Sequence, residues 1–182
     1  MATRCWGYVT LTGSAQPAFA TTLASAFVVK TDGNGVPLPG QVVAVTDATN
    51  FKKGDRVQIV EANGTLGEFC TLAAISSNNV TLAHIKNSHA SGAWFILAEA
   101  GCSLYIQTYD QNAGKVGIGT GSAVTLTGGA GNPLIMILEI PSGGMPPEFS
   151  SANIFGSNPK NSQDCWVIGT SNDKILPSLE SV

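Results

Sequence analysis

Apolar and polar residues alternate in short runs between residues 51 and 97, and each run stops at Gly, Asn or Ser. Residues 56–60, 68–75, 80–84 and 93–97 show the alternation of strands that bury one face. Residues 41–46 supply a further strand before them. The pattern therefore predicts a small antiparallel barrel or curled sheet over residues 41–100.

Short strands are also predicted at residues 102–109, 115–119, 123–127, 134–140, 165–169 and 174–179. Their spacing of roughly 8–14 residues is typical of a sandwich or jelly roll, which we expect over residues 101–182. We expect residues 134–140 to be buried on nearly both faces, and Pro177 to place the last strand at an edge or a bulge. No helical period extends beyond two turns, so the predicted fold class is all-β.

The first 40 residues are predicted to form an extended N-terminal arm and a loop. Asp32-Gly33 and Asn34-Gly35 are strong turn dipeptides within the loop. The arm is too short to hold its own core, so we expect it to pack on the following module or on a neighbouring subunit. Two packed modules and one elongated all-β unit both remain open. The candidate interface residues are Trp6, Tyr8, Leu11, Phe19, Leu23 and Phe27.

Charged residues make up only 12% of the chain, against the usual share of roughly 25%. A surface covered by partners would explain this, and a low-charge secreted or β-rich domain would explain it equally well. The net charge is −3 and Lys52-Lys53 is the sole basic pair, so no basic patch favours nucleic acid. The sequence lacks the pattern of a signal peptide or of a membrane span.

Residues with possible chemistry are few and scattered. The four cysteines form no C-x-x-C pair, so we expect free, buried thiols. His84 and His89 flank a predicted loop, and a metal site would need a third ligand there, such as Glu68 or Asp55. Loop histidines without a metal are the commoner case. We therefore predict no catalytic residue, no cofactor and no metal.

Two further patterns carry weaker signals. The glycine run Gly117-Ile-Gly119-Thr-Gly121 lacks the spacing of a dinucleotide-binding loop, so we expect strand and turn glycines. The aromatic residues would suit a carbohydrate platform, but most lie in alternating strands, where a core or interface role is commoner. These aromatic residues are Trp6, Tyr8, Trp94, Tyr105, Tyr109 and Trp166.

Three stretches resemble bacteriophage virion structural proteins. Gln16-Pro17-Ala-Phe19-Ala-Thr-Thr-Leu23 is similar to the opening of many small phage structural proteins, with Ala20 where Gly is usual. Phe51-x-x-Gly54-Asp55-x-Val57-x-Ile59 and His89-x-x-Gly92-Ala93 resemble a small β-module of phage head and tail proteins. Val116-x-Ile118-Gly119 and Trp166-Val-Ile168-Gly169 resemble parts of β-sandwich capsid-decoration proteins.

The resemblance implies a non-enzymatic virion protein, first of all a capsid decoration (cement) protein on the capsid surface, assembled in the host cytoplasm. Its implied partners are the major capsid protein and its own copies, as a homotrimer, and the six candidate interface residues would make these contacts. No nucleic acid or membrane is expected. The alternatives are a tail, neck or head-fibre component and a host-surface or carbohydrate-binding module. An enzyme, such as a depolymerase fragment, has the least support.

Overall fold

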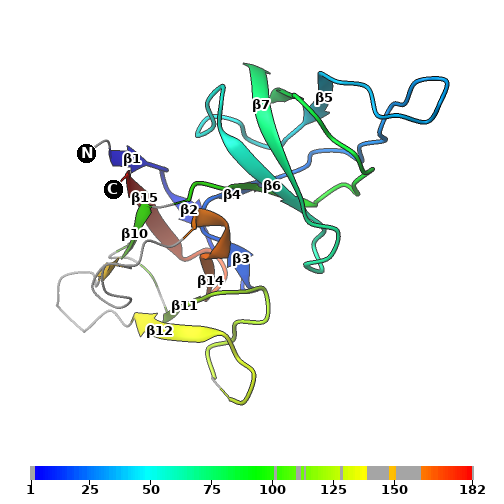
Figure 1. Ribbon diagram of the computed structural model, residues 1–182. Helices are drawn as coiled ribbons and strands as arrows, with labels where there is room; N and C mark the ends of the chain where they lie inside the picture. The colour runs from blue at the N-terminus through cyan, green and yellow to red at the C-terminus, as the bar shows by residue number, and fades with distance from the viewer. Residues whose placement is uncertain are drawn as a thin grey trace. The chain divides into compact units, whose positions relative to one another are not determined.

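Strands provide almost all the regular structure of this chain (Figure 1). The computed structural model describes residues 3–100, 102–109, 112, 114–127, 129–138, 148–150 and 161–181. The one helix among these residues is a single 3-10 turn, Ser162–Asp164 (η1). The predicted all-β class is confirmed. The chain divides into a central unit, Ala20–Glu99, and a split unit that combines Met1–Phe19 with Ala100–Val182.

The central unit is a curled antiparallel sheet in the order β4-β9-β6-β7-β8-β5. Just beyond β4 and β5, Leu23 bridges Val45, and the N–H of Thr46 donates to the carbonyl of Thr22 (2.8 Å). These bonds join the two edge strands, so the predicted barrel-like module is confirmed. Its strands are β4 (Ala20–Thr22), β5 (Gln41–Ala44), β6 (Arg56–Val60), β7 (Glu68–Ser76), β8 (Asn79–Leu82) and β9 (Trp94–Leu97).

Alternation along each strand supplies the core of the central unit. Val57 and Ile59 of β6 are fully buried, and Phe95 of β9 meets Phe51 edge to face at 5.1 Å between ring centroids. Each such side chain contributes about 1.5–3 kcal/mol when it leaves water. The register of β7 with β8 shifts between Leu72 and Ala74, and such a bulge bends a strand. This bend lets β7 follow the curl of the sheet.

The split unit contains two antiparallel sheets and has a sandwich-like character. One sheet has the order β1-β15-β10-β13, with β2 also paired to β15, and the other has the order β12-β11-β14-β3. Ile106, Val116, Val167 and Ile175 are fully buried within this unit. Its strands are β1 (Thr3–Cys5), β2 (Val9–Thr10), β3 (Gln16–Pro17), β10 (Cys102–Thr108), β11 (Val116–Gly119), β12 (Leu134–Leu138), β13 (Glu148–Ser150), β14 (Trp166–Gly169) and β15 (Lys174–Ser181).

The predicted separate N-terminal arm is wrong. β1 and β2 pair with β15, and β3 pairs with β14, so the first 19 residues complete both sheets of the split unit. The residues after them belong to the central unit. The physical reason is that strands of two or three residues show too little alternation to reveal a partner far along the chain.

Of the two alternatives predicted for the last strand, the edge is wrong, because β15 pairs with β10 on one side and with β1 and β2 on the other, whereas an irregularity of the pairing does occur beside Pro177. Cys5 lies opposite Ser178 but Val9 lies opposite Ile175, so the N-terminal side contains one extra residue. The carbonyl of Pro177 accepts from Trp6 N–H (3.0 Å), and the nitrogen of a strand residue faces the same side as its carbonyl. The missing donor of Pro177 therefore faces the interruption between β1 and β2.

Two other predicted strands differ from the structure. Residues 123–127 form turns rather than a strand, although Val124 is buried. In the described residues, β12 pairs only with β11, and Leu134, Met136 and Ile137 are half-buried, so the expected burial on both faces is wrong. Residues 139–140 of that prediction lie outside the described residues.

Gly119 tests the packing of the split unit. A Cβ at this position would lie 2.7 Å from both the carbonyl oxygen of Pro133 and Cγ2 of Val124. We expect Gly119→Ala to lower the free energy of unfolding by about 1–3 kcal/mol through overpacking. Gly33→Ala is the matched control, because a Cβ there meets nothing within 4 Å. Equal denaturation midpoints for the two variants, measured in urea, would contradict this account.

Candidate interaction surface

Five of the six candidate interface residues are buried in the chain itself. Trp6, Leu11, Phe19, Leu23 and Phe27 have exposed fractions between 0% and 8%. The Trp6 and Phe19 rings pack edge to face with centroids 5.9 Å apart. The predicted interface is therefore corrected: these side chains are core residues. Tyr8 differs from them, because 62% of its surface is exposed.

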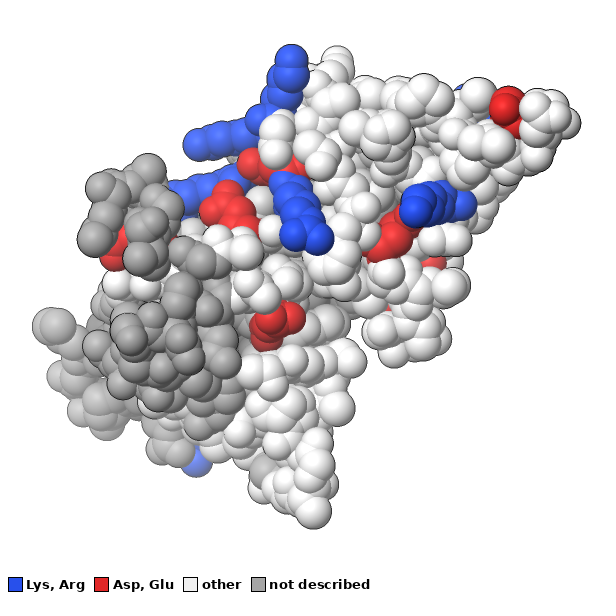
Figure 2. Space-filling view, in the orientation of Figure 1, with Lys and Arg blue, Asp and Glu red and all other residues white. Residues whose placement is uncertain are grey.

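Exposed apolar side chains gather instead in residues 28–42, which we call the 28–42 hairpin. Val28, Val36, Leu38 and Val42 are all exposed there, Val28 at 72%. Lys30 and Asp32 are the only charged residues in this segment. Charges are also sparse over the face drawn in Figure 2, most of which is uncharged. Large apolar side chains that remain in water at one place mark a candidate surface for a partner.

The tip of the 28–42 hairpin is a defined turn, as the Asp32-Gly33 and Asn34-Gly35 dipeptides predicted. The N–H of Asp32 donates to the carbonyl of Val36 (2.8 Å), and the Asp32 carboxylate accepts from the N–H groups of Asn34 and Val36. Thr31 pairs with Pro37, which places Leu38 opposite Lys30. Because opposite and alternate residues share a face, Val36 and Leu38 project to the same side.

A buried glutamine amide completes the backbone ladder at the base of the hairpin. The N–H of Leu38 donates to the carbonyl of Lys30 (2.9 Å). The N–H of Lys30 donates to Oε1 of Gln41 (2.6 Å), and Nε2 of Gln41 donates to the carbonyls of Leu38 (2.8 Å) and Lys30 (3.1 Å). The side-chain amide thus takes the place of a peptide group. A surface held in one conformation loses less entropy when a partner binds.

A buried histidine lies next to the first strand of the hairpin. Phe27, which directly precedes the hairpin, forms a two-bond bridge with the backbone of His89 (2.8 and 2.9 Å). The His89 side chain is fully buried, with Nδ1 at 2.9 Å from Glu61 Oε1 and Nε2 at 2.7 Å from Glu68 Oε1. Both contacts are hydrogen bonds to carboxylates when each ring nitrogen carries a hydrogen. The imidazole ring thus lies between the two carboxylate groups.

The same two carboxylates hold the backbone of the loop that carries His89. Glu68 accepts from the N–H groups of Lys86 (2.9 Å) and Asn87 (3.0 Å), and Glu61 accepts from that of Ala90 (3.3 Å). We call Glu61, His89 and Glu68 the Glu–His–Glu clamp. Both ring nitrogens of His89 and both carboxylates are engaged within the clamp or with the loop, so the clamp holds residues 86–90 beside Phe27.

The structure does not bring together all four residues that the sequence suggested as metal ligands. His89 and Glu68 come together, but His84 is exposed, and Asp55 accepts from the N–H of Lys52 (2.7 Å) in its own turn. Among the described residues, no group of three His, Cys, Asp or Glu side chains is arranged to hold a metal ion. Sequence reasoning did not find Glu61, since 28 residues separate it from His89 and no spacing links them.

The four cysteines all lie in the described part of the chain, and none of them forms a disulfide. Cys70, Cys102 and Cys165 are buried as expected, but Cys5 is exposed. Burial raises the pKa of the Cys165 thiol to about 12, with smaller contributions from Cys102 and Asp164. Burial, and then the charge of Glu68, raises the pKa of the Cys70 thiol to about 12 as well. Both thiols are therefore poor nucleophiles near neutral pH, because the thiolate is the reactive form.

Comparisons of this chain with protein-family models, with curated proteins and with solved structures found no match. In the parts of the chain that the structure describes, no helix has the length and apolar character needed to cross a membrane.

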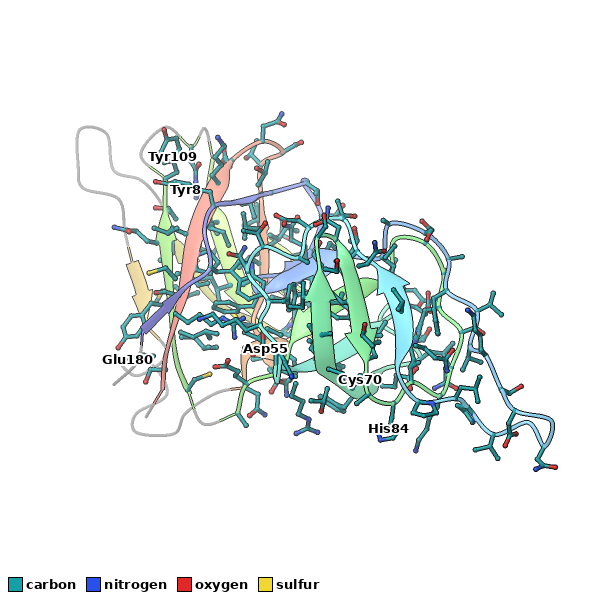
Figure 3. The ribbon with its side chains drawn as sticks, turned by 90° about the horizontal axis from the view of Figure 1, so that it is seen from above. Tyr8, Asp55, Cys70, His84, Tyr109 and Glu180 are labelled. Atoms are coloured by element: carbon teal, nitrogen blue, oxygen red, sulfur yellow. The ribbon has the colours of Figure 1, made fainter. Side chains whose placement is uncertain are left out.

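The clamp predicts a difference between the two histidines. Replacing His89 with Leu leaves two carboxylates facing an apolar side chain and each other, so we expect unfolding to become easier by about 3–5 kcal/mol. His84→Leu is the control, because His84 is exposed (Figure 3). We expect its effect to stay within about 0.5 kcal/mol. Chemical denaturation followed by circular dichroism measures both, and similar midpoints would show that the clamp adds no stability.

The hydrogen bonds of the Gln41 side chain should protect the backbone amide of Lys30 from hydrogen exchange. Gln41→Met keeps the length of the side chain but removes its three hydrogen bonds, so amide exchange at Lys30 should speed up by roughly tenfold or more. Hydrogen–deuterium exchange with peptide or NMR readout measures this rate. Gln107→Met, at an exposed position of β10, should leave the hairpin unchanged. An unaltered Lys30 rate in Gln41→Met would mean that the amide does not brace the hairpin.

Proposed function

We propose that this chain is a non-enzymatic bacteriophage virion protein, a capsid decoration protein that binds the major capsid protein and its own copies on the head. The sequence resemblance to phage structural proteins supports this assignment. The low charge content supports it as well, because a protein that works inside an assembly keeps part of its surface covered. The six-strand curled sheet and the sandwich-like unit suit a rigid binding component.

The observation that carries the proposal is the 28–42 hairpin. It presents Val28, Val36, Leu38 and Val42 to solvent on a loop that backbone bonds and Gln41 hold in place. Burial of one such side chain against a partner is worth about 1.5–3 kcal/mol before the costs of association. We assign this surface to contact with the major capsid protein. It replaces the buried arm residues in that role.

The chemistry of the described residues also favours binding over catalysis. General acid–base catalysis uses histidine most often; here His89 is enclosed by two carboxylates and His84 is an exposed residue outside that cluster. The ring nitrogens of His89 and the carboxylates of Glu61 and Glu68 are engaged in hydrogen bonds with each other and with the backbone of residues 86–90. These features support a protein that acts by binding a partner through its surface.

The first test is the amount of this protein in purified particles. A decoration protein should be present in a fixed, high ratio to the major capsid protein, and quantitative mass spectrometry measures that ratio. Cryo-electron microscopy should then place it over the whole head. A few copies at one vertex would replace this proposal with a tail, neck or head-fibre role. Absence from the particles would reject a virion role altogether.

The second test uses the double variant Val36→Ser, Leu38→Ser. Both side chains are exposed, so the variant should fold, and its affinity for particles that lack the protein should fall by at least about tenfold. Leu66→Ser is the control, because Leu66 is also a large, exposed apolar residue but lies outside the hairpin. Particle occupancy is measured after incubation and sedimentation. Equal occupancy by the double variant and the unchanged protein would exclude the hairpin as the docking surface.

A further inference from the structure

Tyr8 and Tyr109 form an aromatic pair in the split unit. Figure 3 shows the two side chains next to each other, and their ring centroids lie 5.5 Å apart at an interplanar angle of 73°. Tyr8 is 62% exposed and Tyr109 is half-buried. Of the six aromatic residues that the sequence suggested for a carbohydrate platform, Trp6 and Trp166 are buried, and Tyr8 is the one that stands in solvent.

The extra residue between β1 and β2 turns Tyr8 outward. In a regular strand Trp6 and Tyr8 would share a face, because alternate side chains do. Gly7 between them has φ +87°, a left-handed conformation that glycine adopts without strain. Trp6 consequently enters the core while Tyr8 points to solvent. The exposure of Tyr8 is thus built into the backbone.

Tyr109 and the neighbouring Lys174 are fixed by a second side-chain amide. The N–H of Lys174 donates to Oδ1 of Asn112 (2.7 Å), and the carbonyl of Lys174 accepts from Nδ2 of Asn112 (2.8 Å) and from the N–H of Tyr109 (3.1 Å). Nζ of Lys174 lies 5.7 Å from the centroid of the Tyr109 ring. The exposed residues Tyr8 and Lys174 therefore flank Tyr109 on either side.

We propose that Tyr8, Tyr109 and Lys174 form a binding site for an acidic saccharide. A sugar ring has an apolar C–H face that stacks on an exposed aromatic ring, and a carboxylate on that ring pairs with the ammonium group of Lys174 through a charge-assisted hydrogen bond. The Asn112 amide holds the two elements in place, which lowers the entropy cost of binding.

The surroundings of Tyr8 favour a saccharide over a protein partner. Hot spots of protein interfaces sit among other contacts that exclude water. Among the described residues, the other large exposed hydrophobic side chains all lie in the central unit, and Tyr8 has exposed polar neighbours in Thr10 and Lys174, which pair with each other across β2 and β15. A single aromatic ring in a polar setting matches a small ligand with polar edges.

The test is an NMR titration of the full chain with methyl glucuronide and with methyl glucoside, which differ only in the carboxylate. We expect the glucuronide to shift the amide signals of residues near Tyr8, Tyr109 and Lys174 at millimolar concentrations, and to bind about tenfold more tightly than the glucoside. Absence of these shifts, or equal affinity for both glycosides, would overturn the proposal.

Three variants locate the binding. Tyr8→Ala should abolish the shifts, Lys174→Gln should remove the preference for the glucuronide, and Phe69→Ala is the matched control. Phe69 is an exposed aromatic residue of the central unit, so its removal should change nothing. Retained binding in Tyr8→Ala or retained preference in Lys174→Gln would refute the site. The hairpin variant Val36→Ser, Leu38→Ser should bind the glucuronide normally, so this result is independent of the proposed virion role.

Discussion

Pairing of backbone hydrogen-bonding groups is the constraint on which this structure depends. The described residues contain almost no helix, so each strand N–H and carbonyl must find a partner in another segment, because a buried unpaired group costs about 1–3 kcal/mol. Most strands here are short, so none is stable alone. The central unit meets the constraint by joining β4 to β5 beyond their ends, and the split unit meets it by recruiting β1, β2 and β3.

Where the strand ladders stop, side-chain amides continue them. Gln41 supplies a donor and an acceptor at the base of the 28–42 hairpin, and Asn112 does the same for the backbone of Lys174. Each amide lies beside one of the two exposed apolar features of the molecule. The hydrogen bonds that complete the sheets also order these surfaces during folding. Less conformational entropy is then lost when a partner binds. Rigid support beneath an exposed apolar group is what a binding surface needs.

Much of the central unit could be predicted from the sequence, because its strands alternate clearly and polar turns separate them. The prediction for β6 matches the observed Arg56–Val60, and the turns at Gly54 and Asn34-Gly35 have the expected residues. Alternation does not distinguish a core from an interface, since both bury apolar side chains. The sequence therefore predicts an interface role for Trp6 and Phe19, whereas the two rings pack against each other in the core.

The Glu–His–Glu clamp and the Tyr8–Tyr109 pair were beyond sequence reasoning for a different reason. Their members lie far apart in the chain and come together only through the registers of several strands.

The split unit as a whole is also built from segments that lie far apart in the chain. Because β15 pairs with β1 and β2 on one side and with β10 on the other, its sheet lacks a central strand until residues 174–181 have been synthesised. The central unit, whose strands all lie between Ala20 and Glu99, can fold while the rest is being synthesised. The topology thus sets an order of folding, with the central unit first and the split unit, whose two segments flank it in the sequence, afterwards.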